Sequence, residues 1–492
     1  MITTLTADIA RRWLTEGVRQ LAAVRTRVDA LNVFPVPDAD TGTNVVLTVS
    51  AGMRRAQQLP PDASLPALTA AVAHGALWGA RGNSGIIISQ AFQAVARTFA
   101  QVPEAGPTHL IQALDAIALA AHDAVAEPVE GTIITVSRAV ADAVVQLPVD
   151  TSLAEVAATA HRAGIASLLE TGEQLREATG AQATFDAGAA SFVVLLDALA
   201  HALGVEDRPA IPWESATDTP EGHACPELGG GEFEVMYVVQ TDRRHAHQLR
   251  SHLRSVGQSV AVVAGQDQHW HVHVHLDDPA QALPDIPAQQ VAVRNPHTPA
   301  DHPRVVATCT APGLLEHLAR CGAVALLNPT RDALIQTLID APAATILPAS
   351  ETITAMAREV ADDPLIKAEG ITVQVADTDC DPHVFAACAE WGVAQLVDEY
   401  AHPHPIANDV AAEARVIDIT ANSAHQVESL AAAALRQLHP EGEPVTVFVG
   451  DTPLAPVLAA AIRQALPDSD VTELPSAQRT PDVWLLYREP GE

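Results

Sequence analysis

Lysine is almost absent from this chain of 492 residues, and Lys367 is the single example. No lysine is therefore available to bind phosphate before that position, which excludes a lysine-dependent phosphate loop there. Positive charge of any kind is scarce, since 28 lysines and arginines face 60 acidic residues and give a net charge of −32. This balance argues against a nucleic-acid partner, whose phosphates need a basic surface. It also argues against docking on anionic lipid.

Cysteine is scarce too, and none of the five cysteines stands in a Cys-x-x-Cys pair. We therefore expect reduced, inert thiols in a cytoplasmic protein. The N-terminal segment lacks a basic region followed by an apolar run, as a secretory signal would require. No apolar stretch approaches the length of a membrane span. These absences predict a soluble, cytoplasmic protein with no stable membrane insertion.

Length and composition predict two or three domains, because a chain of this size exceeds one ordinary core. Helical periodicity dominates residues 1–205. Residues 206–231 are rich in proline, glycine and acidic residues, which is typical of a linker. Residues 232–300 indicate a small β-α-β-β unit, an α+β middle domain. Residues 303–492 alternate short strands with helices, which predicts a C-terminal α/β domain with parallel layers.

Two aspartates, Asp38 and Asp40, stand one residue apart in the segment LNVFPVPDADTGTN. The prolines of this segment favour extended backbone, so we expect a loop that ends at a helix starting near Asn44. Two close carboxylates repel each other unless a cation lies between them, and Mg²⁺ prefers such oxygen ligands. The alternative is a capped turn with solvated acids. Neutral oxygens and a close backbone approach come from the residues that follow: Thr41, Gly42, Thr43 and Asn44.

A glycine-rich segment, His74 to Gln90, interrupts an otherwise helical, apolar run. Its consecutive N–H groups would be able to hold phosphate oxygens. The segment is neither a Walker A loop nor a Rossmann fingerprint, because it lacks lysine and follows a helix. The alternative is a plain helix–loop–helix turn. A third segment, FDAGAASF, places Asp186 and Gly188 before a helix, where a helix cap is the simpler interpretation. In the glycine-rich segment, the residues of interest are Gly79, Arg81, Gly82, Asn83, Ser84 and Gly85.

Taken together, these segments resemble the DhaL (Dak2) domain family, the ATP-binding half of dihydroxyacetone kinases. More closely, they resemble the kinase component of bacterial fatty acid kinases. The family reads approximately N-x-F-P-V-P-D-G-D-T-G-T-N, G-A-R-G-N-S-G, E-G-T-hydrophobic-L-T-V and D-A-G. This chain has NVFPVPDADTGTN, GARGNSG, EGTIITV and DAGA, in the same order. Ala39 replaces a glycine of the first motif and leaves its oxygen ligands untouched.

The resemblance implies an all-α barrel of about eight helices, with a nucleotide bound at one end. Asp38 and Asp40 would hold Mg²⁺ against the phosphates of ATP. Arg81 is the only cation within these motifs, and we expect it to stabilise the transferred charge, the alternative being a helix C-cap. Asn32 stands where dihydroxyacetone kinases have a third acidic ligand. The other nucleotide-binding positions would be Thr41, Gly42, Thr43, Asn44, Gly79, Gly82, Asn83, Ser84, Gly85, Thr132, Asp186 and Gly188.

The family's reaction is phosphoryl transfer from ATP to the carboxylate of a fatty acid, which gives an acyl-phosphate. A separate, DegV-like carrier protein presents the fatty acid, the C-terminal region helps to engage it, and the family suggests a homodimer. A fatty acid carboxylate is ionised near pH 7, so it needs no general base, although His74 could lie near. Two alternatives stay open: a non-catalytic nucleotide-binding regulator, and a component of the dihydroxyacetone kinase type.

Four histidines alternate in the segment HWHVHVHLDDP, so a strand would carry all four on one side. The simpler interpretation is a polar strand that faces solvent. The resemblance implies a zinc ion held by His273 and His275 together with a cysteine from an earlier strand. Glu234 stands at the position of that cysteine, and a carboxylate is also a zinc ligand. The resemblance thus implies a structural or interfacial zinc site at Glu234, His273 and His275.

Overall fold

The structure is a computed structural model, and it divides the chain into two compact units. The first comprises residues 1–231 and 238–275, and the second comprises residues 232–237 and 276–492. Asp38 and most of the predicted linker lie outside the residues that the structure describes. The described residues are 2–34, 39–180, 184–213, 231–265, 267–296, 298, 303–339, 341–395, 402–421, 423, 426–435, 444–466 and 469–488.

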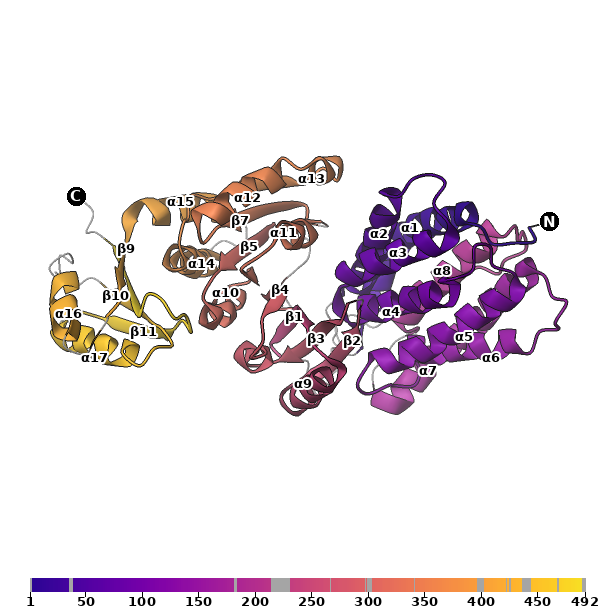
Figure 1. Cartoon of the computed structure of the whole chain (residues 1–492), viewed down its shortest axis with the longest axis horizontal. Coiled ribbons are helices and arrows are strands. Elements are labelled where there is room, and N and C mark those ends of the chain that lie inside the picture. Colours follow the sequence, from indigo (N-terminus) through magenta and orange to yellow (C-terminus); the bar gives the residue numbers. More distant parts are fainter. Residues whose placement is uncertain are drawn as a thin grey trace. The chain divides into compact units, whose positions relative to one another are not determined.

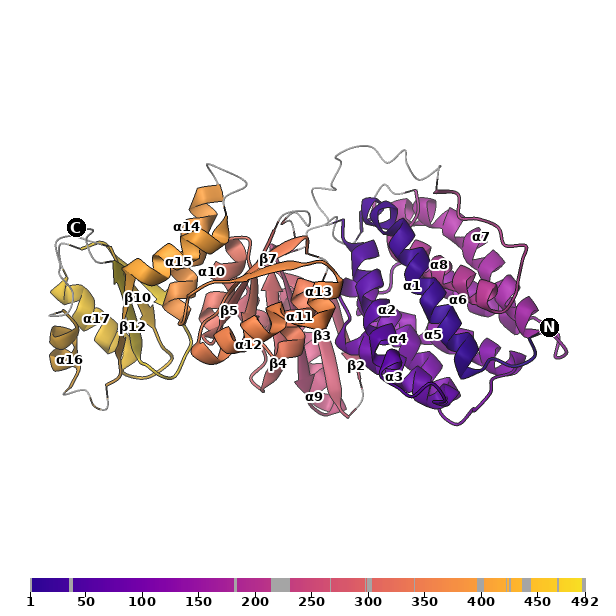
Figure 2. The ribbon, with the colours of Figure 1, turned by 90° about the horizontal axis from the view of Figure 1, so that it is seen from above.

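The described part of the chain before residue 203 consists of eight helices, which confirms the all-α prediction for this region (Figure 1). Each helix contacts the next along the chain, and α1 also contacts α8, so the helices close into a bundle (Figure 2). The second helix begins three residues before the predicted Asn44. The helices are α1 (Ala7–Ala30), α2 (Thr41–Gln57), α3 (Leu65–Trp78), α4 (Gly82–Phe99), α5 (Pro107–Ala124), α6 (Ile133–Val145), α7 (Leu153–Thr179) and α8 (Ala187–Ala202).

Local capping explains where several of these helices begin and end. The side chains of Thr6, Ser64 and Ser152 accept a hydrogen bond from the first turn of α1, α3 and α7. Such a cap contributes about 1 kcal/mol. Helix α7 ends at Gly180, whose φ of 80° is the left-handed conformation that terminates many helices.

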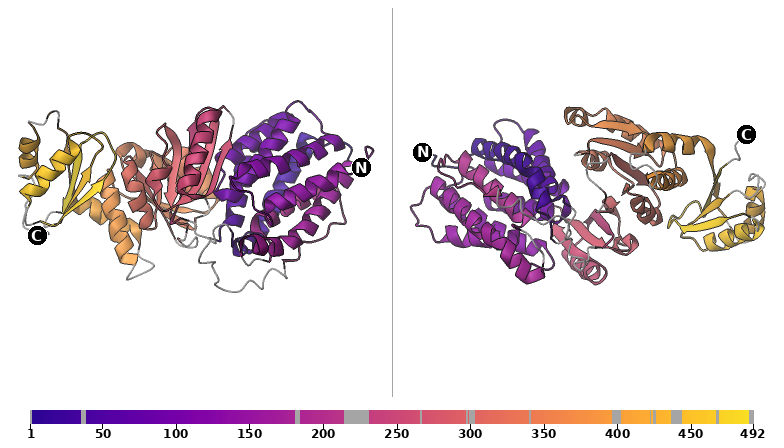
Figure 3. Two further views of the ribbon diagram at one scale, coloured as in Figure 1. Left: turned by 90° about the horizontal axis from the view of Figure 1, so that it is seen from below. Right: turned by 180° about the vertical axis from the view of Figure 1, so that it is seen from behind.

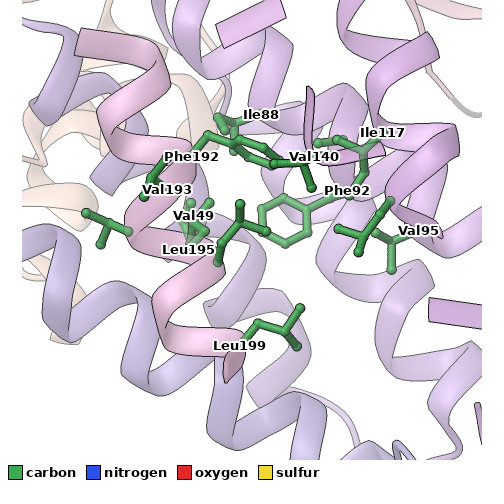
Figure 4. Close-up of a cluster of buried hydrophobic side chains, with 14 of the residues drawn as sticks. Val49, Ile88, Phe92, Val95, Ile117, Val140, Phe192, Val193, Leu195 and Leu199 are labelled. Atoms are coloured by element: carbon green, nitrogen blue, oxygen red, sulfur yellow. The ribbon is translucent and has the colours of Figure 1, made fainter. Parts of the chain in front are cut away.

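Large apolar side chains fill the interior of the bundle (Figure 4). Phe92 of α4 and Phe192 of α8 lie among aliphatic side chains from α2, α5, α6 and α8. The void that remains beside these two rings has a volume of about 40 Å³ and no polar lining. The bundle interior is therefore a packed core, far too small for an acyl chain.

The chain continues into β1 (Phe233–Gln240), α9 (Arg243–Val256), β2 (Gln258–Ala264) and β3 (His269–Leu276), in the predicted β-α-β-β order. Strands β2 and β3 are antiparallel, with Val262 opposite Val272. Val263 of β2 belongs to the same core cluster as the helices. Trp78 of α3 lies edge-on to the rings of His269 and His271, at centroid distances of 5.4 Å each. The middle segment thus shares a hydrophobic core with the helical bundle.

The histidine strand departs from one expectation. His271, His273 and His275 are buried. The interpretation of β3 as a polar strand facing solvent is therefore wrong for these three residues.

Strands β1 to β8 form one sheet in the order β2-β3-β1-β4-β6-β5-β7-β8. Strands β6, β5, β7 and β8 are parallel, as the alternation of strands and helices predicts. Strand β4 is antiparallel to β6, so the sheet is mixed. The remaining elements of this region are β4 (Ala288–Arg294), β5 (Arg304–Cys309), β6 (Val324–Leu327), β7 (Ala343–Leu347), β8 (Thr372–Val375), α10 (Leu315–Arg320), α11 (Arg331–Leu338), α12 (Glu351–Ala361), α13 (Pro364–Ala368) and the short 3₁₀ helices η2 (Pro279–Ala282) and η3 (Pro312–Leu314).

A second sheet, with the order β11-β10-β12-β9, ends the chain. Helices α16 and α17 cover one of its faces (Figure 3). On β10, Val447 belongs to the core beneath these helices, whereas the ring of Phe448 lies edge-on to Phe385 of α14 at 5.2 Å. The elements are β9 (Ala414–Ile419), β10 (Val445–Val449), β11 (Val471–Pro475), β12 (Val483–Arg488), α14 (Asp381–Gln395), α15 (Pro403–Glu413), α16 (Val427–Leu435) and α17 (Ala455–Ala465).

Two surface properties bear on the sequence analysis. None of the helices in the described ranges combines the length and the hydropathy that a membrane span requires. The single lysine, Lys367, lies on α13 with an exposed side chain, and its Nζ is 2.8 Å from Asp362 Oδ1.

Candidate functional site

The first turns of α2, α4, α6 and α8 lie together at one end of the helical bundle. A Cβ atom on Gly82 would lie 2.5 Å from Asn44 Nδ2, so the start of α4 lies close to the start of α2. A Cβ atom on Gly188 would lie 3.5 Å from Ser84 Oγ and 3.6 Å from Ile133 Cβ. The start of α8 therefore lies close to the starts of α4 and α6. Each helix N-terminus carries N–H groups without intrahelical partners and a partial positive charge. Four such termini together favour an anion such as phosphate.

A cavity of about 440 Å³ opens beside three of these helix termini, those of α4, α6 and α8. The backbone and side chains of five predicted site residues line it: Asn83, Ser84, Thr132, Asp186 and Gly188. Asn83 Oδ1 is buried and has no hydrogen-bond partner. An orphaned amide oxygen beside helix N-termini is the kind of group that a ligand or a hydrated cation would satisfy. Much of the remaining wall is apolar, with Val125, Val129, Ile134 and Val260 among its residues.

The glycine-rich segment is a short turn between two helices, which is the alternative interpretation of this segment. Gly79 ends α3, and Gly82, with a φ of 55°, begins α4. A Cβ atom on Gly85 would lie 2.5 Å from Thr48 Oγ1, which in turn accepts a hydrogen bond from Arg81 N at 3.3 Å. Close packing of α4 on α2 therefore requires these glycines. The backbone groups available to phosphate are those of the first turn of α4.

Asp40 directly precedes α2, and its side chain makes no helix-capping hydrogen bond. Its Oδ1 accepts a hydrogen bond from Asn44 Nδ2 at 2.7 Å. The alternative of a simple capped turn thus does not account for the Asp40 carboxylate. Asp38, its partner in the predicted Mg²⁺ pair, lies outside the described residues.

The cap of α2 comes from Asp29, a residue that the sequence analysis missed. Asp29 Oδ1 and Oδ2 accept hydrogen bonds from the backbone N and the Oγ1 of Thr43, both at 2.9 Å. Burial raises the pKa of Asp29, and the nearby charge of Asp40 acts in the same direction. Nothing in the local sequence marks this role, because Asp29 lies on α1 and reaches α2 only through the tertiary fold.

Asn32, a predicted residue of the same segment, is buried, and its backbone N donates a hydrogen bond to Asp29 O at 3.1 Å.

Asp186 joins two of the converging helices. Its Oδ1 accepts hydrogen bonds from Ala189 N at 2.7 Å and from Ile133 N at 2.9 Å. The first contact caps α8, as the simpler interpretation of this motif predicts, and the second holds the start of α6. Asp186 also lines the cavity. The same side chain therefore holds two helices together and lies at the candidate site.

We expect the stability of the protein to depend on pH through Asp186. Burial raises the pKa of Asp186 from 3.8 to about 6. The folded protein therefore binds this proton more tightly than the unfolded chain does. The resulting stabilisation is complete below about pH 4 and is lost as the pH rises through about 6. Asparagine keeps the Oδ1 acceptor but cannot ionise. From about pH 4 to 7, the Asp186→Asn variant should gain up to about 3 kcal/mol of stability relative to wild type.

Urea unfolding of both proteins at several pH values, without nucleotide, measures this difference. Parallel pH profiles for the two proteins would show that Asp186 does not titrate in this range.

The cavity also has a wall from the segment after the helical bundle, which the sequence analysis missed. Arg254 of α9 is the basic side chain among the described lining residues, and its Nη2 lies 2.9 Å from Glu127 Oε1. Ala126 N donates a hydrogen bond to Val260 O at 3.2 Å. These two contacts join the α5–α6 loop to the corner between α9 and β2. No sequence motif marks Arg254, because only the fold brings it to the distant motif residues.

Many predicted site residues are not among the described residues that line the cavity: Asn32, Asp40, Thr41, Gly42, Thr43, Asn44, Gly79, Arg81, Gly82, Gly85 and also His74. His74 lies edge-on to Trp78, with ring centroids 6.1 Å apart, and burial lowers its pKa. This surrounding suits a packed imidazole rather than a general base at the cavity.

The predicted zinc ligands come together on neighbouring strands of the sheet. Glu234, His273 and His275 are all buried, and each offers a ligand atom within 4.8 Å of the other two. Two imidazoles and a carboxylate are a donor set that zinc accepts. Glu234 also forms an ion pair with Arg294, which the sequence did not indicate. The guanidinium competes with a metal ion for this carboxylate, so zinc binding here stays a prediction.

Comparison with known proteins finds two family matches. Residues 35–201 match the model of the DAK2 domain, and residues 230–288 match that of the FakA-like middle domain of fatty acid kinases. The first match contains the motifs at the cavity, apart from Asn32. The second contains Arg254 and the histidine strand.

Individual relatives cover only part of this chain. Protein YloV of Bacillus subtilis is 30% identical over 295 residues, which is 57% of this chain and 53% of YloV. The uncharacterized protein SSP1546 of Staphylococcus saprophyticus is 36% identical over 146 residues, or 30% of this chain and 26% of that protein. The chain thus spans about half of the first relative and about a quarter of the second.

Among solved structures, the dihydroxyacetone kinase from C. freundii in complex with AMP-PNP and Mg²⁺ matches 41% of this chain and 35% of its own. Its TM-score is 0.30 and its sequence identity is 21%.

Proposed function

We propose that this chain, which carries a DAK2 domain followed by a FakA-like middle domain, transfers the γ-phosphoryl group of ATP to a fatty acid carboxylate. The product is an acyl-phosphate, and a separate DegV-like carrier protein presents the fatty acid. One observation carries the proposal: the first turns of α4, α6 and α8 line a cavity of about 440 Å³, and the first turn of α2, which Asp40 precedes, packs against that of α4. That arrangement suits a triphosphate, whose negative charge the helix termini attract.

The cavity has a polar part, at the helix first turns, and an apolar part, and each suits a different part of ATP. The phosphates would lie against the first turns of α4 and α8, where Ser84 and Gly188 line the wall. The adenine would lie against the apolar side chains of Val125, Val129 and Val260. Burial of an aromatic base on such a surface is favourable by about 25 cal/mol per Å².

The acidic loop fits Mg²⁺. The Asp40 carboxylate is not used as a helix cap, and Asn83 Oδ1 is buried without a partner. Asp38, from the same motif, and Asp40 would hold the metal. When bound, it would neutralise charge on the phosphates. The protein's own part is to hold this geometry: Asp29 fixes the first turn of α2, and Asp186 fixes α6 to α8.

The cavity suits an acceptor that is already ionised. In the transfer, a carboxylate oxygen of the fatty acid forms a bond to the γ-phosphorus. The bond from that phosphorus to the bridging oxygen breaks, and ADP leaves. The described lining residues include no histidine, lysine or cysteine. The two acidic residues among them, Asp186 and Glu127, are engaged with backbone N–H groups and with Arg254. A carboxylate needs no base near pH 7, whereas an alcohol would need one.

The packed bundle supports a separate carrier for the acyl chain. Its apolar void measures only about 40 Å³, and the larger cavity is needed for the nucleotide. The acyl chain would therefore stay with the carrier, and only its carboxylate would reach the γ-phosphate. Arg254, at the cavity wall, is placed to neutralise one of these anions.

An ATP turnover assay tests the proposal. The full chain is mixed with Mg²⁺, ATP, oleate and a purified DegV-like carrier, and both ADP and acyl-phosphate are measured. We expect turnover only when carrier and oleate are both present. Turnover with dihydroxyacetone instead would overturn the proposed acceptor. ATP binding without turnover on either acceptor would favour a nucleotide-binding regulator.

A further inference from the structure

Three potential metal ligands meet in the second unit, after strand β8. Asp379, Cys380 and His383 each offer a ligand atom within 4.8 Å of the other two. They lie where the chain leaves the carboxyl end of a parallel strand and enters α14. In open α/β sheets, this edge is where ligands commonly bind.

The imidazole of His383 is the buried part of the cluster. His383 is 9% exposed, and its Nδ1 lies 2.8 Å from Asp379 Oδ1. Its other ring nitrogen, Nε2, is buried and has no hydrogen-bond partner. Because Asp379 lies at Nδ1, this nitrogen is the one that a metal ion shared with Asp379 would bind. The backbone N–H of His383 donates to the sulfur of Cys380, so the thiol lies against the same turn.

We propose that Asp379, Cys380 and His383 bind a transition metal ion of the zinc class. Thiolate, imidazole and carboxylate are the three ligand types of protein zinc sites. Zinc–ligand bonds of about 2.0–2.3 Å place tetrahedral ligands roughly 3.3–3.8 Å apart. A movement of about 1 Å by the exposed Asp379 side chain and the thiol would bring the cluster to that spacing.

The same three residue types could instead form a nucleophilic triad. The residues around the Cys380 thiol argue against a reactive nucleophile. A reactive thiol needs a lowered pKa, from a neighbouring cation or a similar influence. The side chains of Asp379 and Asp381 are acidic and flank Cys380 in the chain, so they would repel a free thiolate, whereas a metal cation would be attracted.

The position of the cluster indicates what the metal would do. Asp381, the first residue of α14, accepts hydrogen bonds from Thr310 N at 2.8 Å and from Thr310 Oγ1 at 2.5 Å. Helix α14 contacts β5 of the larger sheet and β9 and β12 of the smaller one. The metal would therefore anchor the start of the helix that lies between the two sheets of this unit.

Cobalt substitution of the full chain tests the proposal. Co²⁺ bound to a thiolate has a sulfur-to-metal charge-transfer absorption, and the Glu234, His273 and His275 group contains no sulfur. We expect this absorption in the wild type, with one Co²⁺ per chain at the site. The Cys380→Ser variant should lose it, and the His383→Gln variant should need at least tenfold more Co²⁺. The Cys321→Ser variant, which removes a cysteine outside the cluster, should keep it.

Thermal melting provides a second readout that does not depend on absorption. Zinc should raise the melting midpoint of the wild type and of Cys321→Ser by more than that of Cys380→Ser. Circular dichroism of each variant shows whether it folds. If the wild type gives no thiolate absorption with Co²⁺, or Cys380→Ser retains it, the proposed site is wrong. The ATP turnover assay is independent of this result, because the cluster lies in the second unit.

Discussion

The Asp40→Asn variant is expected to lose at least about 100-fold in the rate of phosphoryl transfer, because one charged ligand of the metal is removed. The change keeps the size of the side chain, and the Asn44 amide still has an oxygen to bond, as it does to Asp40 Oδ1 at 2.7 Å in the wild type. The cap of α2 is untouched, since Asp29 supplies it. The turnover number at saturating ATP and Mg²⁺, with the carrier and oleate present, measures the effect.

A matched control separates this effect from a general loss of negative charge. Asp115 lies on the exposed side of α5, and Asp115→Asn should retain the wild-type rate. Both variants should melt close to the wild-type midpoint. If Asp40→Asn is as active as Asp115→Asn, the Asp40 carboxylate does not hold the catalytic metal.

The Gly131→Ala variant is expected to be strongly destabilised, because two costs meet at this position. Gly131 has a φ of 82°, and a left-handed conformation costs a residue with a Cβ about 1–2 kcal/mol. The added Cβ would lie 2.4 Å from Leu175 N. Such overpacking against backbone typically adds about 1–3 kcal/mol. Since Gly131 directly precedes the cavity residue Thr132, nucleotide binding should weaken as well.

Gly180 offers a control with the same backbone conformation and fewer contacts. Its φ is 80°, and among the described residues, apart from its chain neighbours and its own helix backbone, no atom lies within 4 Å of the position of its Cβ. Gly180→Ala should therefore show only the conformational cost. Urea and thermal unfolding of both full-length variants, followed by helical circular dichroism, compare the two costs. If both variants lose the same free energy of unfolding, the added Cβ at position 131 does not destabilise its contact with α7.

The helical half of the fold could be predicted closely because its signals are local. Apolar spacing and capping residues act within a few positions, and the prediction of helices over residues 1–205 agrees with the helices α1 to α8 observed there. The burial of His271 could not be predicted, because Trp78, from a distant helix, provides the contact. The chain ends in two separate sheets rather than one run of α/β layers, since pairing between β9 and β12 depends on residues far apart in sequence.

The candidate site shows the same division. The motifs supplied Asn83, Ser84, Thr132, Asp186 and Gly188, all of which line the cavity. Asp29 and Arg254 escaped notice because each reaches the site through tertiary contacts, to Thr43 and to Glu127. Arg81 was chosen for its charge alone, and charge does not determine where a side chain points. No Cys-x-x-Cys pair marks the Cys380 cluster, and only the fold shows that the side chains of its D-C-x-x-H segment lie together.

The solitary lysine of α13 has a practical consequence. Reagents that acylate amines have one side-chain target in the whole chain, and Lys367 is 60% exposed despite its contact with Asp362. A fluorophore could therefore be conjugated selectively at this position, apart from the terminal amine. The helical bundle contains no lysine to react, so a dye on α13 would report on the second unit while the nucleotide motifs stay chemically unmodified.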